Sequence, residues 1–191
     1  MTINLEKDIE SAVAVLKRGG VILYPTDTVW GLGCDATRPE AVRRIYEIKQ
    51  RADSKAMIVL LSRIDDLWRY VDTVPEVAPE LIGASVRPLT IVYDRGINMA
   101  PELMAADGSV GIRVTRERVS SSLVKALRRP LVSTSANISG KPTPAVYREI
   151  SPEIVNAVDY VMMARRDDEV RSLPSQVIKL SDSGVVRILR K

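Results

Sequence analysis

Residues 133–137, STSAN, bring three hydroxyl groups and an amide together directly after a short apolar run. Such side chains can bind phosphate oxygens, a ribose or metal-bound water, although Ser and Asn also cap ordinary turns. The sequence contains no histidine, which excludes a Ser-His-Asp relay and the His-based zinc sites. Its one cysteine, Cys34, forms no CxxC pair and is expected to be a small buried residue. Any chemistry at residues 133–137 must therefore proceed without an imidazole base.

Basic residues form three groups that could bind an anion. They are Lys49 with Arg51 and Lys55, Arg113 with Arg116 and Arg118, and Arg187 with Arg190 and Lys191. If a helix ends at Lys49, the extended chain after it can direct Lys49 and Arg51 at one anion. A cation at a helix C-terminus also simply stabilises the helix, which accounts for Lys49 but poorly for Arg51. The net charge of +4 permits an anionic ligand or a nucleic-acid partner and demonstrates neither.

The segment YPTDTVWGLG, residues 24–33, is a further candidate for ligand binding. Pro25 ends a predicted strand, and the polar residues 26–28 follow at a strand end, where ligands usually bind. A turn in which Thr and Asp bond their own backbone is the alternative. The overlapping GLGCDA fits the G-x-G-x-x-A dinucleotide pattern formally, but its glycines do not lie at a tight strand-to-helix turn. We therefore expect no Rossmann site, and no Walker-type P-loop sequence occurs.

Hydrophobic periodicity predicts an α/β protein that positions these groups. Helices are expected at 4–19, 39–49, 63–71, 76–84 and 116–129, and a weaker one at 145–157. Strands are expected at 21–24, 57–62, 89–94, 109–114, 130–134, 159–164, 175–181 and 185–190. Ser62 and Thr115 are the expected N-caps of two of the helices, and residues 25–38 are expected to form a long loop. The last two strands form an antiparallel hairpin, so the sheet must be mixed.

The composition sets the class of protein. A length of 191 residues without a linker or repeat predicts one domain, residues 1–191. With 46% apolar residues and no Phe, the core must be built from Val, Ile, Leu, Ala and Met. The first ten residues carry acids instead of a signal peptide, and no stretch approaches the roughly 18 apolar residues of a membrane span. We expect a soluble cytoplasmic protein without membrane contact.

Together, these stretches resemble the YrdC/TsaC family of threonylcarbamoyl-AMP synthases. Lys49-x-Arg51 with Ser135-x-Asn137 is similar to the K-x-R…S-x-N signature of that family. YPTDTVWGLGCDA, VGIRV and VSTSANISGKPTP resemble family blocks in the same order, from about residue 10 to the C-terminus. The resemblance is to the short, single-domain form. It implies a YrdC-like twisted, mixed, open sheet with flanking helices around a deep basic groove.

The resemblance also implies a reaction that needs no histidine. Family members join L-threonine, bicarbonate and ATP, with Mg²⁺, to give threonylcarbamoyl-AMP and pyrophosphate. A separate transferase complex then uses the product for the t6A modification of tRNA adenosine 37. The carbamate of threonine is already an anionic oxygen nucleophile, so positioning and electrostatics can supply most of the acceleration.

Site residues are carried over from the matching motifs. The resemblance implies that the catalytic residues Lys49, Arg51, Ser135 and Asn137 bind ATP, with the last two on the nucleotide or its Mg²⁺. Arg190 would border the nucleotide site, and no protein side chain is expected to hold the metal directly. Threonine would be bound by Thr26, Arg113, Ser133 and Ser175. The sequence departs from the family at Gln176, at Ala56 and in VRPLT (86–90), which replaces the common W-P-G-P-L-T.

Two other functions remain open from the sequence. A non-catalytic module could bind double-stranded RNA or tRNA in the same basic groove, and weak RNA binding could also accompany catalysis. The modest net charge and an aromatic content of 4% argue against a stacking surface for RNA. A carbamoyl-adenylate enzyme, similar to the related domain of hydrogenase-maturation carbamoyltransferases, is the third possibility. Those larger proteins usually carry zinc-finger motifs, which are absent here.

Overall fold

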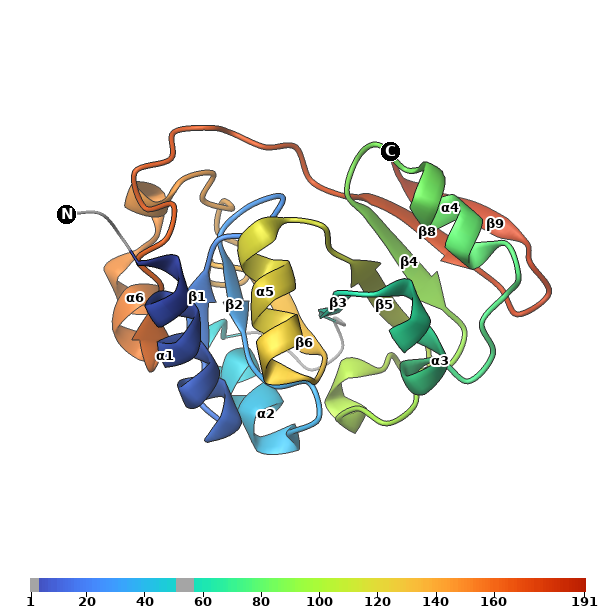
Figure 1. The fold of residues 1–191 in the computed structure, drawn as a ribbon, viewed down its shortest axis with the longest axis horizontal. Coiled ribbons are helices and arrows are strands. Elements are labelled where there is room, and N and C mark those ends of the chain that lie inside the picture. Colours follow the sequence, from blue (N-terminus) through green and yellow to red (C-terminus); the bar gives the residue numbers. More distant parts are fainter. Residues whose placement is uncertain (1–3, 51–56) are drawn as a thin grey trace.

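A mixed sheet forms the centre of the molecule in the computed structural model, which describes residues 4–50 and 57–191 (Figure 1). This part of the chain contains nine strands in the spatial order β7-β1-β2-β6-β3-β5-β4-β8-β9. They are β1 (Ile22–Tyr24), β2 (Gly31–Gly33), β3 (Ile58–Leu61), β4 (Leu89–Tyr93), β5 (Val110–Val114), β6 (Leu131–Ser135), β7 (Tyr160–Val161), β8 (Gln176–Leu180) and β9 (Val186–Arg190). Parallel pairs such as β3/β5 lie beside antiparallel pairs such as β8/β9. The predicted mixed, open α/β sheet and its C-terminal hairpin are confirmed.

Helices flank the sheet, and the local sequence explains where the longest three begin. The helices are α1 (Leu5–Lys17), α2 (Pro39–Ile48), α3 (Leu67–Tyr70), α4 (Ala78–Ala84), α5 (Arg118–Leu127) and α6 (Pro152–Ala157), with 3-10 turns η1 (Ile64–Asp66), η2 (Pro101–Leu103) and η3 (Tyr147–Glu149). At the start of α1 the Asn4 side chain accepts the Lys7 amide, and Pro39 opens α2. Before α5, the Glu117 carboxylate accepts two first-turn amides. Within the described residues, no helix combines the length and apolar character needed to cross a membrane.

The two faces of the sheet carry separate cores. Helices α1 and α5 pack side by side on one face, over a core that includes Ile22, Leu60 and Leu131 (Figure 1). The other face packs against α2 and α6 through side chains such as Val132. Because strand residues alternate between faces, Ser133 lies on the same face as Leu131. The face that is apolar beneath α1 and α5 therefore becomes polar farther along β6.

Strand β2 is the main difference from the predicted elements, because its residues were expected to lie in a loop. Gly31–Gly33 pairs with both β1 and β6 near the middle of the sheet. A Cβ on Gly33 would lie 2.6 Å from the Tyr24 ring and 2.9 Å from the Val132 carbonyl oxygen. Close tertiary packing therefore requires glycine here, although glycine has a weak strand propensity. Hydrophobic periodicity could not indicate such a strand.

Helix boundaries also differ at three places. The expected N-cap Thr115 is replaced by Glu117, while η1 and α3 replace the helix expected after Ser62 and have no side-chain cap. Residues 145–157 divide into η3 and α6. Pro152 opens α6 and favours extended backbone at Ser151, which breaks a continuous helix.

The strand expected at 159–164 is also shorter than predicted, since β7 ends at Val161. The amides of Met163 and Ala164 instead donate to the buried carboxylate of Asp8 on α1. This carboxylate replaces the ladder hydrogen bonds that would have extended the strand.

Candidate active site

A cavity of about 570 Å³ lies over the polar part of the sheet. Its floor comes from β2, β6, β3, β5, β4 and β8, and its walls come from the β1–β2 loop and from residues 143–145 and 172–175. The chain between β7 and β8 crosses the upper side of the molecule in Figure 1 and brings Ser172 and Pro174 to the cavity. Lining residues from the described chain include Arg113 and Arg190 but no Asp or Glu. The cavity therefore favours an anionic ligand.

Six of the predicted site residues line this one cavity although they come from distant parts of the sequence. They are Thr26, Arg113, Ser133, Ser135, Ser175 and Arg190. The sheet register explains part of this convergence. Ser133 on β6 pairs with Ile58 of β3, which in turn pairs with Gly111 of β5, two residues before Arg113. Because side chains two apart share a face, the Ser133 hydroxyl and the Arg113 guanidinium open on the same side.

Lys49 and Asn137 lie behind the cavity wall instead of lining it. Lys49 ends α2, is 2% exposed, and donates from Nζ to the carbonyl oxygens of Ser135 at 2.5 Å and Asn137 at 2.7 Å. The Ser135 hydroxyl donates to Oδ1 of Asn137 at 2.5 Å. The buried ammonium thus holds the turn that follows β6. The predicted partner Arg51 lies outside the described residues, as do Lys55 and Ala56.

Arg113 forms a buried ion pair with Asp27, a residue that the sequence flagged only as part of a polar segment. One guanidinium nitrogen of Arg113 donates to Asp27 Oδ1, and the two side chains are 5% and 14% exposed. The Nε of Arg113 is buried and has no hydrogen-bond partner among the described residues. Burial raises the pKa of Asp27, and the Arg113 charge opposes that shift. Arg113 therefore retains a buried donor beside the cavity.

Ser175 and Arg190 form a second fixed cluster on the opposite wall. Arg190 donates from Nη2 to Ser175 Oγ at 3.1 Å and from Nε to the Ser175 carbonyl oxygen at 3.0 Å. The Ser175 hydroxyl also lies 3.1 Å from Oγ1 of Thr90. Thr90 belongs to the segment that departs from the family pattern, and it was not predicted as a site residue. Its register opposite Val177 on β8 is visible only in the fold.

Arg165 is a supporting residue that no sequence signal indicated. It donates to the Thr26 carbonyl oxygen at 2.9 Å and lies 3.4 Å from Glu117. Its backbone has φ +59°, a left-handed conformation that is uncommon for residues other than glycine. Arg165 thus ties the β1–β2 loop to the start of α5.

Metal binding by the protein alone has no support in the described part of the chain. No group of three His, Cys, Asp or Glu side chains is arranged there to hold a metal ion. The Ser135 hydroxyl and the Asn137 side-chain oxygen are oxygen donors of the kind that Mg²⁺ accepts when phosphates and water complete its shell. The residues therefore fit a metal that arrives with a phosphate ligand.

The mixed α/β sheet carries one cavity lined by hydroxyl groups, backbone atoms and guanidinium groups, a lining that suits a small anionic ligand. The sequence profile of the Sua5/YciO/YrdC family, described as "Telomere recombination", matches residues 14–191. The chain belongs to this family.

Individual relatives agree with the family. The threonylcarbamoyl-AMP synthase of Xanthomonas campestris pv. campestris (strain B100) is 36% identical over 187 residues, covering 96% of this chain and 97% of its own. Escherichia coli YciO superposes with a TM-score of 0.82 at 27% identity, over 97% of this chain and 89% of its own. The Sua5 of P. abyssi, solved with L-threonine, superposes at 0.81 and 27% identity over 94% of this chain, which spans about half of that Sua5 chain.

Proposed function

We propose that this chain is an L-threonylcarbamoyladenylate synthase, a nucleotidyltransferase that joins L-threonine, bicarbonate and ATP into threonylcarbamoyl-AMP and pyrophosphate. The observation that carries the proposal is the convergence of six motif-matched side chains, from Thr26 to Arg190, on one cavity. The synthase names of its relatives at 34–36% identity support the same activity.

Threonine would bind at the wall formed by Arg113, Thr26, Ser133 and Ser175. Arg113 has a buried Nε without a partner in the described chain, and a guanidinium fork suits a carboxylate. The Ser133 and Ser175 hydroxyls are within the same cavity and can accept or donate to the amine and hydroxyl of the ligand. The L-threonine bound to the P. abyssi Sua5 supports this choice of ligand.

ATP would occupy the part of the cavity near Ser135 and Arg190, with Lys49 and Arg51 on its phosphates. Lys49 donates to two backbone carbonyl oxygens of the 135–137 turn, so its charge would act on the phosphates from beneath that turn. Ser135 and Asn137 would contact the nucleotide or the water bound to the Mg²⁺ that ATP brings. The bound ion would neutralise charge on the phosphates.

The protein's contribution to the reaction is positioning. The threonine amine adds to the carbon of bicarbonate-derived CO₂, and the amine proton leaves as water with the hydroxide that bicarbonate releases, which gives a carbamate. A carbamate oxygen then attacks the α-phosphorus of ATP, and the bond to the bridging oxygen breaks so that pyrophosphate leaves with its electron pair. Fixed donors around both substrates align the two groups and stabilise developing charge, and no histidine is required.

The setting of the reaction follows from its product. We propose that residues 1–191 act as one domain in the cytoplasm and that a tRNA-modifying transferase complex consumes threonylcarbamoyl-AMP. Direct tRNA binding is not needed for the adenylation itself.

Pyrophosphate release from ATP by the purified protein tests the proposal. We expect release that requires both L-threonine and bicarbonate, and that falls at least tenfold, about 1.4 kcal/mol of barrier, in Lys49→Ala. Pyrophosphate release that does not depend on threonine would contradict the proposal.

A further inference from the structure

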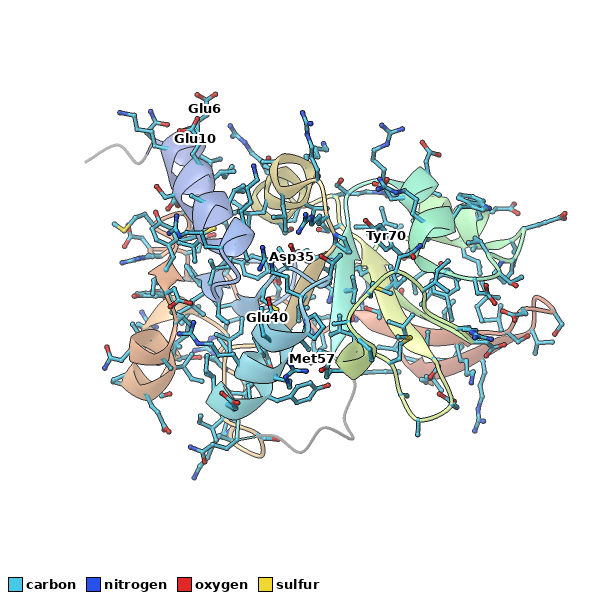
Figure 2. The ribbon with its side chains drawn as sticks, turned by 90° about the horizontal axis from the view of Figure 1, so that it is seen from below. Glu6, Glu10, Asp35, Glu40, Met57 and Tyr70 are labelled. Carbon is cyan, nitrogen blue, oxygen red and sulfur yellow. The ribbon has the colours of Figure 1, made fainter. Side chains whose placement is uncertain are left out.

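Strand β9 is an exposed edge of the sheet. It stands last in the strand order, beside β8, and all five of its residues are exposed. Figure 1 shows it on the right, and Figure 2 shows the same pale red strand at the end of the molecule opposite α1, on which Glu6 and Glu10 are labelled. Apart from Arg190, whose side chain reaches the candidate active site, β9 has no part in the proposed reaction.

The pairing of β9 with β8 identifies its outward backbone groups. In an antiparallel pair, every second residue exchanges both hydrogen bonds with the partner strand, and the residues between them direct theirs outward. The Ser181 amide donates to the Val185 carbonyl oxygen at 3.0 Å, and the register stays regular from there to Ile188. Val186 and Ile188 therefore direct their N–H and C=O groups away from β8. Such groups are a template on which another strand can pair.

The side chains of β9 continue a core face beyond the edge of the core. Val186 and Ile188 lie opposite Leu180 and Ile178, which are both buried in the core on that face. Ile188 itself is 60% exposed. Arg187 lies between the two apolar residues, so its side chain points to the other face. It forms no ion pair with any residue that the structure describes.

The charge of this edge selects among possible occupants. A basic residue on an edge strand can serve only to prevent pairing with another copy of the chain, which would account for Arg187. It would not account for the exposed apolar side chains on both sides of Arg187. Residues 185–191, VVRILRK, carry three basic side chains and no acidic one. A second copy would bring the same charges to the edge, whereas an acidic strand would complement them.

We propose that β9 binds an extended segment of another protein, in which acidic and apolar residues alternate, as an additional strand of the sheet. The backbone of Val186 and Ile188 would supply hydrogen bonds, and apolar side chains of the segment would cover theirs. A carboxylate beside Arg187 would set the register. Arg190 follows on the same strand and donates to Ser175, so the bound segment would lie beside the cavity wall. This interaction goes beyond the proposed function, since the adenylation requires no partner protein.

A labelled seven-residue peptide of alternating Val and Glu tests the proposal by fluorescence anisotropy. We expect saturable binding to the wild type and at least fivefold weaker binding to Ile188→Pro, because proline removes an outward N–H and leaves the β8 hydrogen bonds in place. Arg187→Glu should bind this peptide at least fivefold more weakly, and should bind a Val–Lys peptide more tightly than the wild type does. Arg118→Glu, an equal charge change at the start of α5, should behave like the wild type.

Four results would overturn the proposal. The first is a lack of saturable binding to the wild type, and the second is equal binding of the acidic peptide with all its amides N-methylated. The third is an Arg187→Glu variant that binds no differently from Arg118→Glu. The fourth is a wild-type dimer in sedimentation that Ile188→Pro dissociates, which would assign the edge to a second copy. These measurements use neither ATP nor threonine, so their failure leaves the proposed function intact.

Discussion

Arg113 and Asp27 show how a single buried pair can serve both the fold and a ligand. Each charge is almost removed from water, so each depends on the other. The Arg113 Nε, buried and without a partner in the described chain, has capacity for another acceptor. A carboxylate ligand would supply it.

Asp27→Asn should expose this dependence. We expect the free energy of unfolding to fall by about 3 kcal/mol, because the variant leaves the Arg113 charge buried without a counterion. Saturating L-threonine should then raise the melting temperature of the variant more than that of the wild type. Chemical denaturation with and without threonine measures both effects, and a loss below about 0.5 kcal/mol would show that the pair is unimportant.

Ser175→Ala tests the opposite wall of the cavity. Ser175 accepts from Arg190 and contacts Thr90, so the alanine variant leaves the Arg190 fork less well fixed. We expect kcat/KM for threonine to fall about tenfold, or about 1.4 kcal/mol, with little change in melting temperature. Ser183→Ala removes a hydroxyl from the exposed turn before β9 and is the matched control. Equal effects in the two variants would contradict a role for Ser175 at the site.

At the scale of elements, close backbone packing decides what periodicity could not. Sequence patterns predicted five of the elements. Helices α1 and α2 have amphipathic patterns, and strands β1, β3 and β6 have short apolar runs, because the buried positions of each element carry apolar residues. Strand β2 carries no such pattern. Its position depends on Gly31 and Gly33, which allow β1, β2 and β6 to pack closely. Thr90 and Arg165 were missed for a related reason: their roles arise from register and backbone conformation, not from residue type.

Gly33→Ala should destabilise the sheet strongly. The added methyl group would lie less than 3 Å from the Tyr24 ring and from the Val132 carbonyl oxygen. The Val132 backbone can move away only by distorting the strand pairing, which costs free energy. We expect a loss of about 3 kcal/mol in the free energy of unfolding. Gly83→Ala on α4 has nothing within 4 Å of its new methyl group and should gain about 0.5–1 kcal/mol from helix propensity. Equal stability of the two variants in urea would refute the packing argument.

Asp159 joins three elements and gives a prediction about pH. Its carboxylate accepts from Arg44 of α2 and from the Val21 amide before β1. Burial alone would raise the pKa of Asp159, but these hydrogen bonds outweigh it and hold the pKa below its ordinary value. The contribution to stability is therefore complete above the ordinary Asp pKa of about 3.9 and is lost as the pH falls through the lowered value.

The effect of Asp159→Asn on the free energy of unfolding should therefore depend on pH. Near pH 7 we expect a loss of about 1 kcal/mol, a modest value because the side chain is partly exposed and screened by solvent. The difference from wild type should shrink as the pH approaches about 2. Urea unfolding at both pH values measures it, and a constant difference would mean that the negative charge of Asp159 does not matter.

At the scale of the whole molecule, sequence motifs predicted which residues meet but not how each is oriented. Thr26, Ser135 and Arg190 line one cavity. Lys49 was expected at the ATP phosphates, and the carbonyl oxygens of Ser135 and Asn137 compete with such phosphates for its ammonium. Motif spacing carries no information on such a competition.

Mass spectrometry of the product formed with ¹³C-bicarbonate tests the central claim most directly. With ATP and L-threonine present, we predict a labelled threonylcarbamoyl-AMP that disappears when any one of the three substrates is omitted. The label must lie in the carbonyl that links the threonine nitrogen to the α-phosphate oxygen. Conversion of ATP without a labelled adenylate would contradict the account.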